Sequence, residues 1–277
     1  FSDKLKKALR DLYSDLRIPV QQSIDEDACP DANFEDMFVE LRLDEFNATI
    51  GPEIPDYRDV DYLQKRMQSS KPIQLAQLFD KIHDKDVPRT VLILGRPGVG
   101  KTTVIKKMAR LWAKGQLWKG TVEYLFVITL RHCQQDRKLT LADLLLDGLE
   151  LTDSERTAAM KLLRKQRSKL VIIADERDAN KDVELNTMLS SITANVMLPG
   201  AKIVIMSRPR PNLPRCNRKT ELYGFTHESI QKYIHQFSRE DSDLEDFISD
   251  YLQNNVNIAS MCYLPVHCNF VCVCLHD

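Results

Sequence analysis

The chain has 277 residues, of which 43% are hydrophobic and 29% are charged, a composition typical of a globular protein with a sizeable core. Its 39 basic and 40 acidic residues leave a formal net charge of −1, so no overall field draws it to nucleic acid or to an anionic membrane. The hydrophobic runs are strand-sized and fall short of the roughly 20 residues that a membrane-spanning helix needs. We therefore expect no membrane span and no specific nucleic-acid partner.

The cysteines and the N-terminal residues indicate the cellular compartment in which the protein is expected. The seven cysteines are odd in number, and four of them lie in one apolar C-terminal stretch, which predicts reduced core thiols rather than a secreted disulfide framework. A metal site built from Cys268, Cys272 and the neighbouring His267 and His276 is less favoured, because zinc sites use separated ligand pairs on turns. The chain begins at Phe1 without a signal-peptide pattern, so we expect a cytoplasmic piece of a longer protein.

Residues 1–88 are expected to form a helical and acidic flanking segment. Leucines recur at helical spacing through Phe1–Leu16, which predicts an amphipathic helix. Acidic residues and prolines dominate Asp25–Asp61, as in an irregular connector, and the alternating Phe38–Leu43 predicts a short edge strand within it.

Residues 89–225 alternate between short apolar runs and helical stretches. This alternation predicts a three-layer α/β domain with a parallel sheet, and the continuous apolar runs indicate strands buried on both faces. Residues 226–277 follow as a small helical domain. The expected strands are Thr90–Leu94, Val122–Leu130, Leu170–Ala174, Lys202–Met206 and Leu222–Phe225, and the expected helices are Thr102–Gly115, Leu141–Leu149, Asp153–Gln166, Ile230–Phe237, Asp241–Leu252 and Ile258–Leu275.

The strongest motif comes directly after the first expected strand and opens a helix. Its eight residues are Gly95, Arg96, Pro97, Gly98, Val99, Gly100, Lys101 and Thr102, the spacing of a phosphate-binding P-loop. Glycines let the backbone N–H groups surround a phosphate chain, and the helix that follows presents its positive end to it. Lys101 is expected to reach the β and γ phosphates, Thr102 to ligate Mg²⁺, and Thr103 to complete the nucleotide-binding set.

Two later strands end in residues suited to a nucleotide site. Asp175 follows the apolar run Leu170–Ala174, where an acid can serve as a second Mg²⁺ ligand, and Glu176 or Asp178 is a candidate for polarising an attacking water. Arg208 follows the run Lys202–Met206 and is the candidate sensor of a γ-phosphate, because its charge pairs only with an anion in reach.

Together these motifs resemble the NACHT module of the NOD-like receptors, in the STAND branch of the P-loop ATPases. The resemblance covers nearly the whole chain and is more specific than any one motif. Beyond the P-loop it is carried by Tyr13–Ile18, Leu78–Phe79, Leu111–Gly115, Tyr124–Phe126 with Arg131, Ser207–Pro209, Leu222–Thr226 and Met261–Cys268.

The resemblance implies a nucleotide-binding domain followed by the family's first helical domain. It implies that Tyr13 and Ser14 belong to a segment covering adenine, that Pro265 packs on the base, and that the ligand is ADP or ATP with Mg²⁺. It further implies a switch in innate immune signalling: ADP holds a closed state, whereas ATP, through Arg208, favours an open state that self-associates through the nucleotide-binding domain. The family's effector and sensor regions would lie on other parts of the receptor.

One departure from the family pattern concerns hydrolysis. Family members have glycine after the first acid and then an acidic pair, whereas here Glu176 follows Asp175, and Asp178 is followed by Ala179. We therefore expect slow or impaired hydrolysis, with Glu176 as an alternative water-orienting group. Two other interpretations stay open: a turnover ATPase or kinase, and a pseudo-ATPase scaffold that binds nucleotide without hydrolysing it.

Overall fold

A computed structural model describes residues 1–16, 18–19, 31–32, 37–46, 70–82, 87–129, 140–175, 191–192, 197–209, 213–239 and 241–276. The chain forms two compact units, each assembled from segments far apart in the sequence. Unit 1 comprises Phe1–Leu16, Gln74–Leu94 and Val104–Thr220, and unit 2 comprises Arg17–Ile73, Gly95–Thr103 and Glu221–Asp277.

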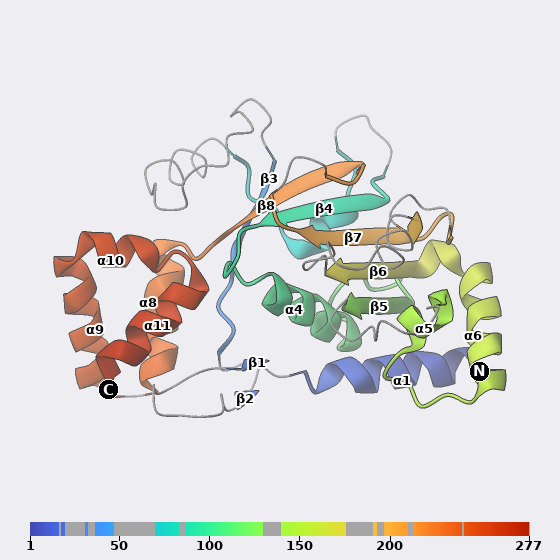
Figure 1. Ribbon diagram of the computed structural model, residues 1–277, viewed down its shortest axis with the longest axis horizontal. Helices are drawn as coiled ribbons and strands as arrows, with labels where there is room; N and C mark the ends of the chain where they lie inside the picture. The colour runs from blue at the N-terminus through green and yellow to red at the C-terminus, as the bar shows by residue number, and fades with distance from the viewer. Residues whose placement is uncertain are drawn as a thin grey trace. The chain divides into compact units, whose positions relative to one another are not determined.

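A six-stranded sheet has the order β3-β8-β4-β7-β6-β5 (Figure 1). The pairs β4 with β7, β7 with β6 and β6 with β5 are parallel, and β4 and β6 are buried at every position. This confirms the predicted α/β fold, because only a parallel sheet covered on both faces needs such continuous apolar strands. The strands are β3 (Arg42–Glu45), β4 (Thr90–Gly95), β5 (Tyr124–Thr129), β6 (Leu170–Asp175), β7 (Lys202–Ser207) and β8 (Arg218–Gly224).

Helices flank the strands of unit 1. The amphipathic α1 (Ser2–Ser14) buries Leu5, Leu9 and Tyr13 and packs against β5 and α6, as Figure 1 shows. α5 also packs against β5 and α6. The remaining helical elements are η1 (Leu75–Phe79), α4 (Lys101–Ala113), α5 (Leu141–Leu146), α6 (Asp153–Lys165) and η3 (Arg167–Lys169).

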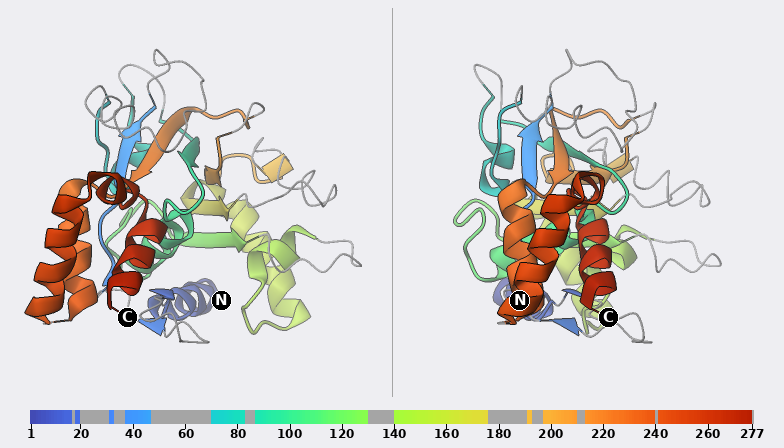
Figure 2. Two further views of the ribbon diagram at one scale, coloured as in Figure 1. Left: turned by 60° about the vertical axis from the view of Figure 1, so that its left-hand side comes forward. Right: turned by 90° about the vertical axis from the view of Figure 1, so that its left-hand side faces the viewer.

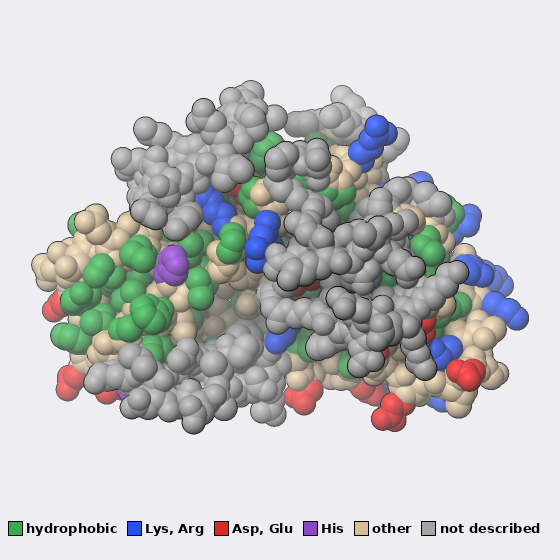
Figure 3. Space-filling model, viewed as in Figure 1, with side chains coloured by type: hydrophobic (Ala, Val, Ile, Leu, Met, Phe, Trp, Pro, Cys, Tyr) green, Lys and Arg blue, Asp and Glu red, His purple; other side chains and the backbone are tan. Residues whose placement is uncertain are grey.

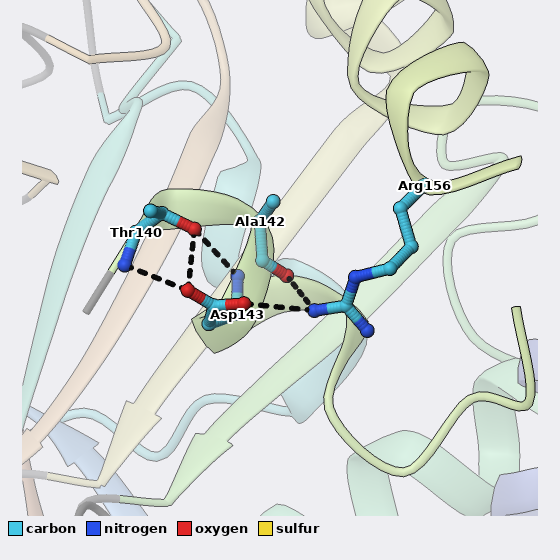
Figure 4. A network of polar contacts seen from close by, with 4 residues as sticks. All are labelled: Thr140, Ala142, Asp143 and Arg156. Atoms are coloured by element: carbon cyan, nitrogen blue, oxygen red, sulfur yellow. Dashed lines mark hydrogen bonds and ion pairs between the residues drawn. The ribbon is translucent and has the colours of Figure 1, made fainter. Parts of the chain in front are cut away.

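Capping boxes fix where α5 and α6 begin. The Thr140 hydroxyl accepts a hydrogen bond from the Asp143 N–H at 3.2 Å, while the Asp143 carboxylate accepts from the Thr140 N–H at 2.9 Å (Figure 4). The other carboxylate oxygen of Asp143 lies 3.0 Å from Arg156 of α6, so the cap of one helix is also tied to the next. Thr152 and Glu155 form the same reciprocal pair at the start of α6.

Unit 2 contains a helical bundle with its own core. α8 packs against α9 and α11, and the short α10 contacts both α9 and α11 (Figure 2). The buried cluster includes Met37 and Val39 from the acidic connector, far from the helices in sequence. The elements of unit 2 outside the sheet are β1 (Ile18–Pro19), β2 (Asp31–Ala32), α8 (His227–Ser238), α9 (Ser242–Asn254), α10 (Val256–Met261) and α11 (Pro265–His276).

Several expected elements have other bounds in the structure. The strand expected at Leu222–Phe225 begins earlier, at Arg218, and the helix expected at Leu141–Leu149 ends at Leu146. The single helix expected over Ile258–Leu275 is divided into α10 and α11, because Pro265 lacks an N–H and is accommodated only in a helix's first turn. The edge strand expected over Phe38–Leu43 begins later, at Arg42, and positions 37–39 are buried one after another instead of alternating.

Candidate functional site

The P-loop has the backbone expected of a phosphate-binding turn. Gly98 and Gly100 adopt φ values of +76° and +95°, which residues with a Cβ atom rarely adopt. Lys101 begins α4, its side chain is buried, and its Nζ donates to the carbonyl oxygens of Gly95 at 2.7 Å and Arg96 at 2.8 Å. A buried ammonium held by its own loop is placed to exchange these carbonyls for phosphate oxygens.

Three side chains of unit 2 lie against the glycines of this loop. A Cβ on Gly98 would come within 2.3 Å of Val266 Cγ1, and a Cβ on Gly100 would lie 2.7 Å from Leu41 Cδ1 and 4.0 Å from Pro265 Cγ. The Val266 N–H also donates to the Gly98 carbonyl at 3.4 Å. Pro265, a predicted site residue, is thus brought to the P-loop by the start of α11.

A second close approach links β8 to the same part of the helical bundle. The Phe225 N–H donates to the Tyr263 carbonyl at 2.9 Å, and a Cβ on Gly224 would lie only 2.3 Å from that oxygen. Gly224 has φ +105°, so this junction needs glycine both for its conformation and for space. The residues from Tyr263 to Val266 therefore contact β8 at one end and the P-loop at the other.

In unit 1, the strand register brings the other predicted residues to one edge of the sheet. Leu94, just before the P-loop, pairs with Ser207, and Met206 pairs with Asp175. The Asp175 side chain is buried, whereas Arg208 directly after β7 is exposed. Because β7 lies between β4 and β6, Arg208 leaves the sheet between the strand that leads into the P-loop and the strand that ends in Asp175.

Tyr13 and Ser14 anchor α1 to unit 1. The Tyr13 hydroxyl accepts from the Val127 N–H at 3.1 Å, its ring packs edge-to-face on Trp112, and burial raises the pKa of Tyr13 to about 12. Arg110 of α4 donates to the Ser14 carbonyl at 2.6 Å. These contacts fix the end of α1, and a role for Tyr13 and Ser14 at the adenine stays a prediction.

Four further predicted residues follow β6 or begin α4. Glu176 and Asp178 lie outside the described residues, so their proposed roles stay predictions. Thr102 and Thr103 are half-buried in the first turn of α4. Leu41, which lies against Gly100, is not among the predicted site residues, because the sequence places it in an edge strand. Its only signal was an apolar run within an acidic connector.

The predicted metal ligands are of residue types that Mg²⁺ accepts together with a nucleotide. This cation commonly takes one or two protein oxygens and completes its shell with water and phosphate, and Thr102 and Asp175 supply a hydroxyl and a carboxylate. No group of three or more His, Cys, Asp and Glu residues in the described ranges is arranged to hold a metal by itself. In the part of the chain that the structure describes, no helix is long and apolar enough to span a membrane.

Comparisons with known proteins identify the family of the chain. The NACHT domain family matches residues 89–241. Over 223 residues the chain is 26% identical to human Protein NLRC5. This match covers 76% of this chain and 12% of that protein. It is 26% identical over 227 residues to NACHT, LRR and PYD domains-containing protein 1a allele 5 of Rattus norvegicus, with coverages of 73% and 18%.

Two further likenesses were found. The human NACHT, LRR and PYD domains-containing protein 12 is 25% identical over 231 residues, with coverages of 75% and 21%. A solved structure of C. elegans PCH-2 is similar at 12% identity and a TM-score of 0.37, over 78% of this chain and 66% of that one. The chain thus spans between 12% and 21% of the three sequence relatives named. The chain belongs to the NACHT domain family and carries the nucleotide-binding P-loop of a NOD-like-receptor-type protein.

Proposed function

We propose that the chain is the ADP- and ATP-binding switch of a NOD-like-receptor-type innate immune sensor. The observation that carries the proposal is the packing of α11 on the P-loop, where Val266 and Pro265 lie against Gly98 and Gly100. A ligand shifts a conformational equilibrium only by its different affinities for the two states. Helical-bundle residues in contact with the phosphate-binding loop give the ligand a direct means of favouring one arrangement of that bundle.

Most of the predicted residues have a defined task in this proposal. The P-loop backbone from Gly95 to Gly100 donates N–H groups to the phosphates, and Lys101 transfers its hydrogen bonds from two carbonyls to phosphate oxygens. Thr102 and Asp175 hold Mg²⁺, which neutralises phosphate charge when bound. Pro265 packs on the base, and Arg208 distinguishes ATP from ADP through the γ-phosphate.

The proposal also covers turnover and partners. Hydrolysis is slow or impaired because of the altered residues after Asp175, with Glu176 and Asp178 as the groups that act on water. Exchange of ADP for ATP opens the protein and exposes a self-associating surface of the nucleotide-binding domain. The cytoplasm is the proposed compartment, and effector and sensor regions are expected on other parts of the longer protein, as in relatives whose names include LRR and PYD domains.

The nucleotide that copurifies with the protein tests the switch directly. After acid denaturation, ion-exchange chromatography should find near-stoichiometric ADP, and added ATP should turn over slowly. Lys101→Ala removes the ammonium that faces the phosphates and should abolish both ADP retention and the thermal stabilisation by added ADP, which is about 2.7 kcal/mol at a hundredfold excess over Kd.

Lys119→Ala is the matched control, because Lys119 is an exposed lysine outside the P-loop. It should retain the wild-type ADP content and stabilisation. Protein that copurifies without nucleotide and hydrolyses ATP over many turnovers would support the turnover ATPase instead. Bound nucleotide with no measurable turnover would support the pseudo-ATPase scaffold.

A further inference from the structure

The start of α8 is tied to the segment before β3, which lies on the P-loop. The Ser229 hydroxyl, in the first turn of α8, donates to the carbonyl oxygen of Glu40 at 2.9 Å. Glu40 directly precedes Leu41, and a Cβ on Gly100 would lie 2.7 Å from Leu41 Cδ1. One side-chain hydrogen bond therefore connects α8 to the backbone beside a residue that lies against the P-loop.

The N-cap of α8 orients the Ser229 hydroxyl for this bond. The Thr226 hydroxyl accepts from the Ser229 N–H at 3.2 Å and donates to the Ser229 Oγ at 3.1 Å. Because a carbonyl oxygen can only accept, the Ser229 proton goes to Glu40 while the Ser229 oxygen accepts from Thr226. Hydrogen bonds in such a chain polarise and strengthen one another. The helix cap thus also serves the contact with Glu40.

The segment that carries Leu41 packs on the helical bundle mainly through its beginning. Met37 and Val39 are buried in the bundle core, whereas Leu41 is half-buried and packs at the margin of the same cluster. The Glu40 residue between them is exposed. The hydrogen bond from Ser229 therefore adds a fixed point at the less buried end of the segment, next to the side chain that contacts the P-loop.

The α11 segment on the P-loop is held in a similar way. Val266 is 51% exposed, and Figure 3 shows hydrophobic side chains at the surface of the helical bundle. With so much of the side chain exposed, packing alone holds this segment weakly. The Phe225 N–H, just before α8, donates to the Tyr263 carbonyl at 2.9 Å and adds a second fixed point. The start of α8 is thus bonded to both segments that lie on the P-loop glycines.

We propose that Ser229 is a positioning residue for the P-loop: its hydrogen bond to Glu40 holds Leu41 against Gly100 and slows the release of a bound nucleoside diphosphate. The proposal rests on the proposed function, because it concerns the same nucleotide site. A loop that is already held in its bound shape loses less conformational freedom when the ligand binds, and the gain in affinity is expressed mostly as slower release. Loss of the hydrogen bond should loosen the loop at Gly100 while the fold remains.

Three variants separate this role from a purely structural one. Ser229→Ala removes the hydroxyl and keeps the N–H that donates to Thr226, so the cap of α8 is preserved. Ser229→Thr keeps a hydroxyl and should restore the wild-type behaviour. Ser249→Ala is the matched control, because Ser249 is also a half-buried serine of the bundle, and its hydroxyl donates to the Gln231 side chain of α8 at 3.5 Å.

Release of a fluorescent ADP analogue is the first measurement. Ser229→Ala should release it about twofold to tenfold faster than the wild type, the range expected for one net hydrogen bond. Ser249→Ala and Ser229→Thr should release it at the wild-type rate. Urea unfolding without nucleotide is measured on the same variants. Lower stability of Ser229→Ala together with unchanged release would show a structural role only and would overturn the proposal.

A double-mutant cycle tests whether Ser229 acts through Leu41. Leu41→Ala should itself speed release, and the addition of Ser229→Ala should have little further effect, because the hydrogen bond then has no leucine side chain to place on the loop. Rate increases that multiply in the double variant would exclude the route through Leu41. Leu41→Val takes the place of Leu41→Ala if circular dichroism shows that the alanine variant does not fold.

Hydrogen exchange of the nucleotide-free protein separates this proposal from the proposed function. Peptides covering residues 37–43 and 95–103 should exchange faster in Ser229→Ala than in the wild type or in Ser249→Ala. If the wild type binds no ADP analogue at all, the proposed function fails, and these peptides still decide whether Ser229 holds the loop. Exchange at the wild-type rate in both peptides would contradict the proposed link.

Discussion

At Gly224 the backbone has φ +105°, and a Cβ would lie 2.3 Å from the Tyr263 carbonyl oxygen. Gly120 shares the left-handed conformation at φ +79°, but nothing lies within 4 Å of a Cβ placed there. Alanine substitutions at the two glycines therefore distinguish two effects on the free energy of unfolding. At Gly120 only the strained backbone conformation matters, whereas at Gly224 a steric clash is added.

Alanine at these two glycines should have different effects. Gly120→Ala should lower the free energy of unfolding by about 1 to 2 kcal/mol, the strain of a Cβ in the left-handed region. Gly224→Ala should cost about 1 to 3 kcal/mol more, because the clash is with backbone and cannot be relieved by a rotamer change. Urea unfolding measures both, and equal losses would show that the contact with Tyr263 is unimportant.

The site residues that sequence could predict are those with a local signature. Lys101 is identified by its spacing from the glycines, and Asp175 by the apolar strand before it. Leu41 and the Tyr263 carbonyl have no such signature, because each contacts the P-loop or β8 only through long-range packing. A backbone carbonyl in particular leaves no trace in residue type.

At the scale of elements, the strands could be predicted because burial on both faces leaves continuous apolar runs. β4 and β6 coincide closely with the runs expected at Thr90–Leu94 and Leu170–Ala174. Helix ends were harder to predict. The division at Pro265 is explained by proline chemistry, but the apolar run on both sides of it concealed the boundary between α10 and α11.

The capping box of α5 predicts that the Thr140 hydroxyl makes a measurable contribution to the stability of the fold. Thr140→Ala removes the acceptor of the Asp143 N–H and should lower the free energy of unfolding by about 1 kcal/mol. Thr157 is the control, since its exposed hydroxyl donates only to the Asp153 carbonyl within α6. Thr157→Ala should leave stability unchanged or raise it by a few tenths of a kcal/mol, because alanine favours helix interiors. Similar losses in both variants would contradict a capping role.

At the scale of the whole molecule, acid sensitivity follows from ion pairs that hold α1. Lys4 donates to Glu155 at 2.5 Å, and this bond, with the N–H of Thr152, lowers the pKa of Glu155 from 4.5 to about 2. The carboxyl of Glu123 has its pKa lowered by Lys169 and Lys6. A carboxyl whose pKa is lower in the folded than in the unfolded protein stabilises the fold. This stabilisation is complete above the pKa of the unfolded state and is lost as the pH falls toward the pKa of the folded state.

Glu155→Gln tests this pH dependence, because glutamine keeps the capping box and loses only the charge. The wild type should unfold at a higher urea concentration than the variant near pH 6, and the difference should shrink steadily between about pH 4.5 and pH 2. The effect should be modest and weaken with salt, since the pair is exposed. A difference that is constant with pH would exclude the charge as its source.

How the segments gather into two units could not be predicted from the sequence. Local patterns indicate where helices and strands form, but the packing of residues 37 to 41 on the helical bundle depends on apolar contacts between distant segments. Such contacts leave no periodic signal in the chain.

The interleaving of the two units also has a consequence for biosynthesis. The ribosome releases Gly95–Thr103 well before it has made Glu221–Asp277, the segment that carries Val266 and Tyr263. At elongation rates of about 5 to 20 residues per second, the nascent P-loop spends about 8 to 30 seconds without the residues that later pack on it. Vectorial folding can complete much of unit 1 during that interval, whereas unit 2 can be completed only after its last segment, Glu221–Asp277, has been made.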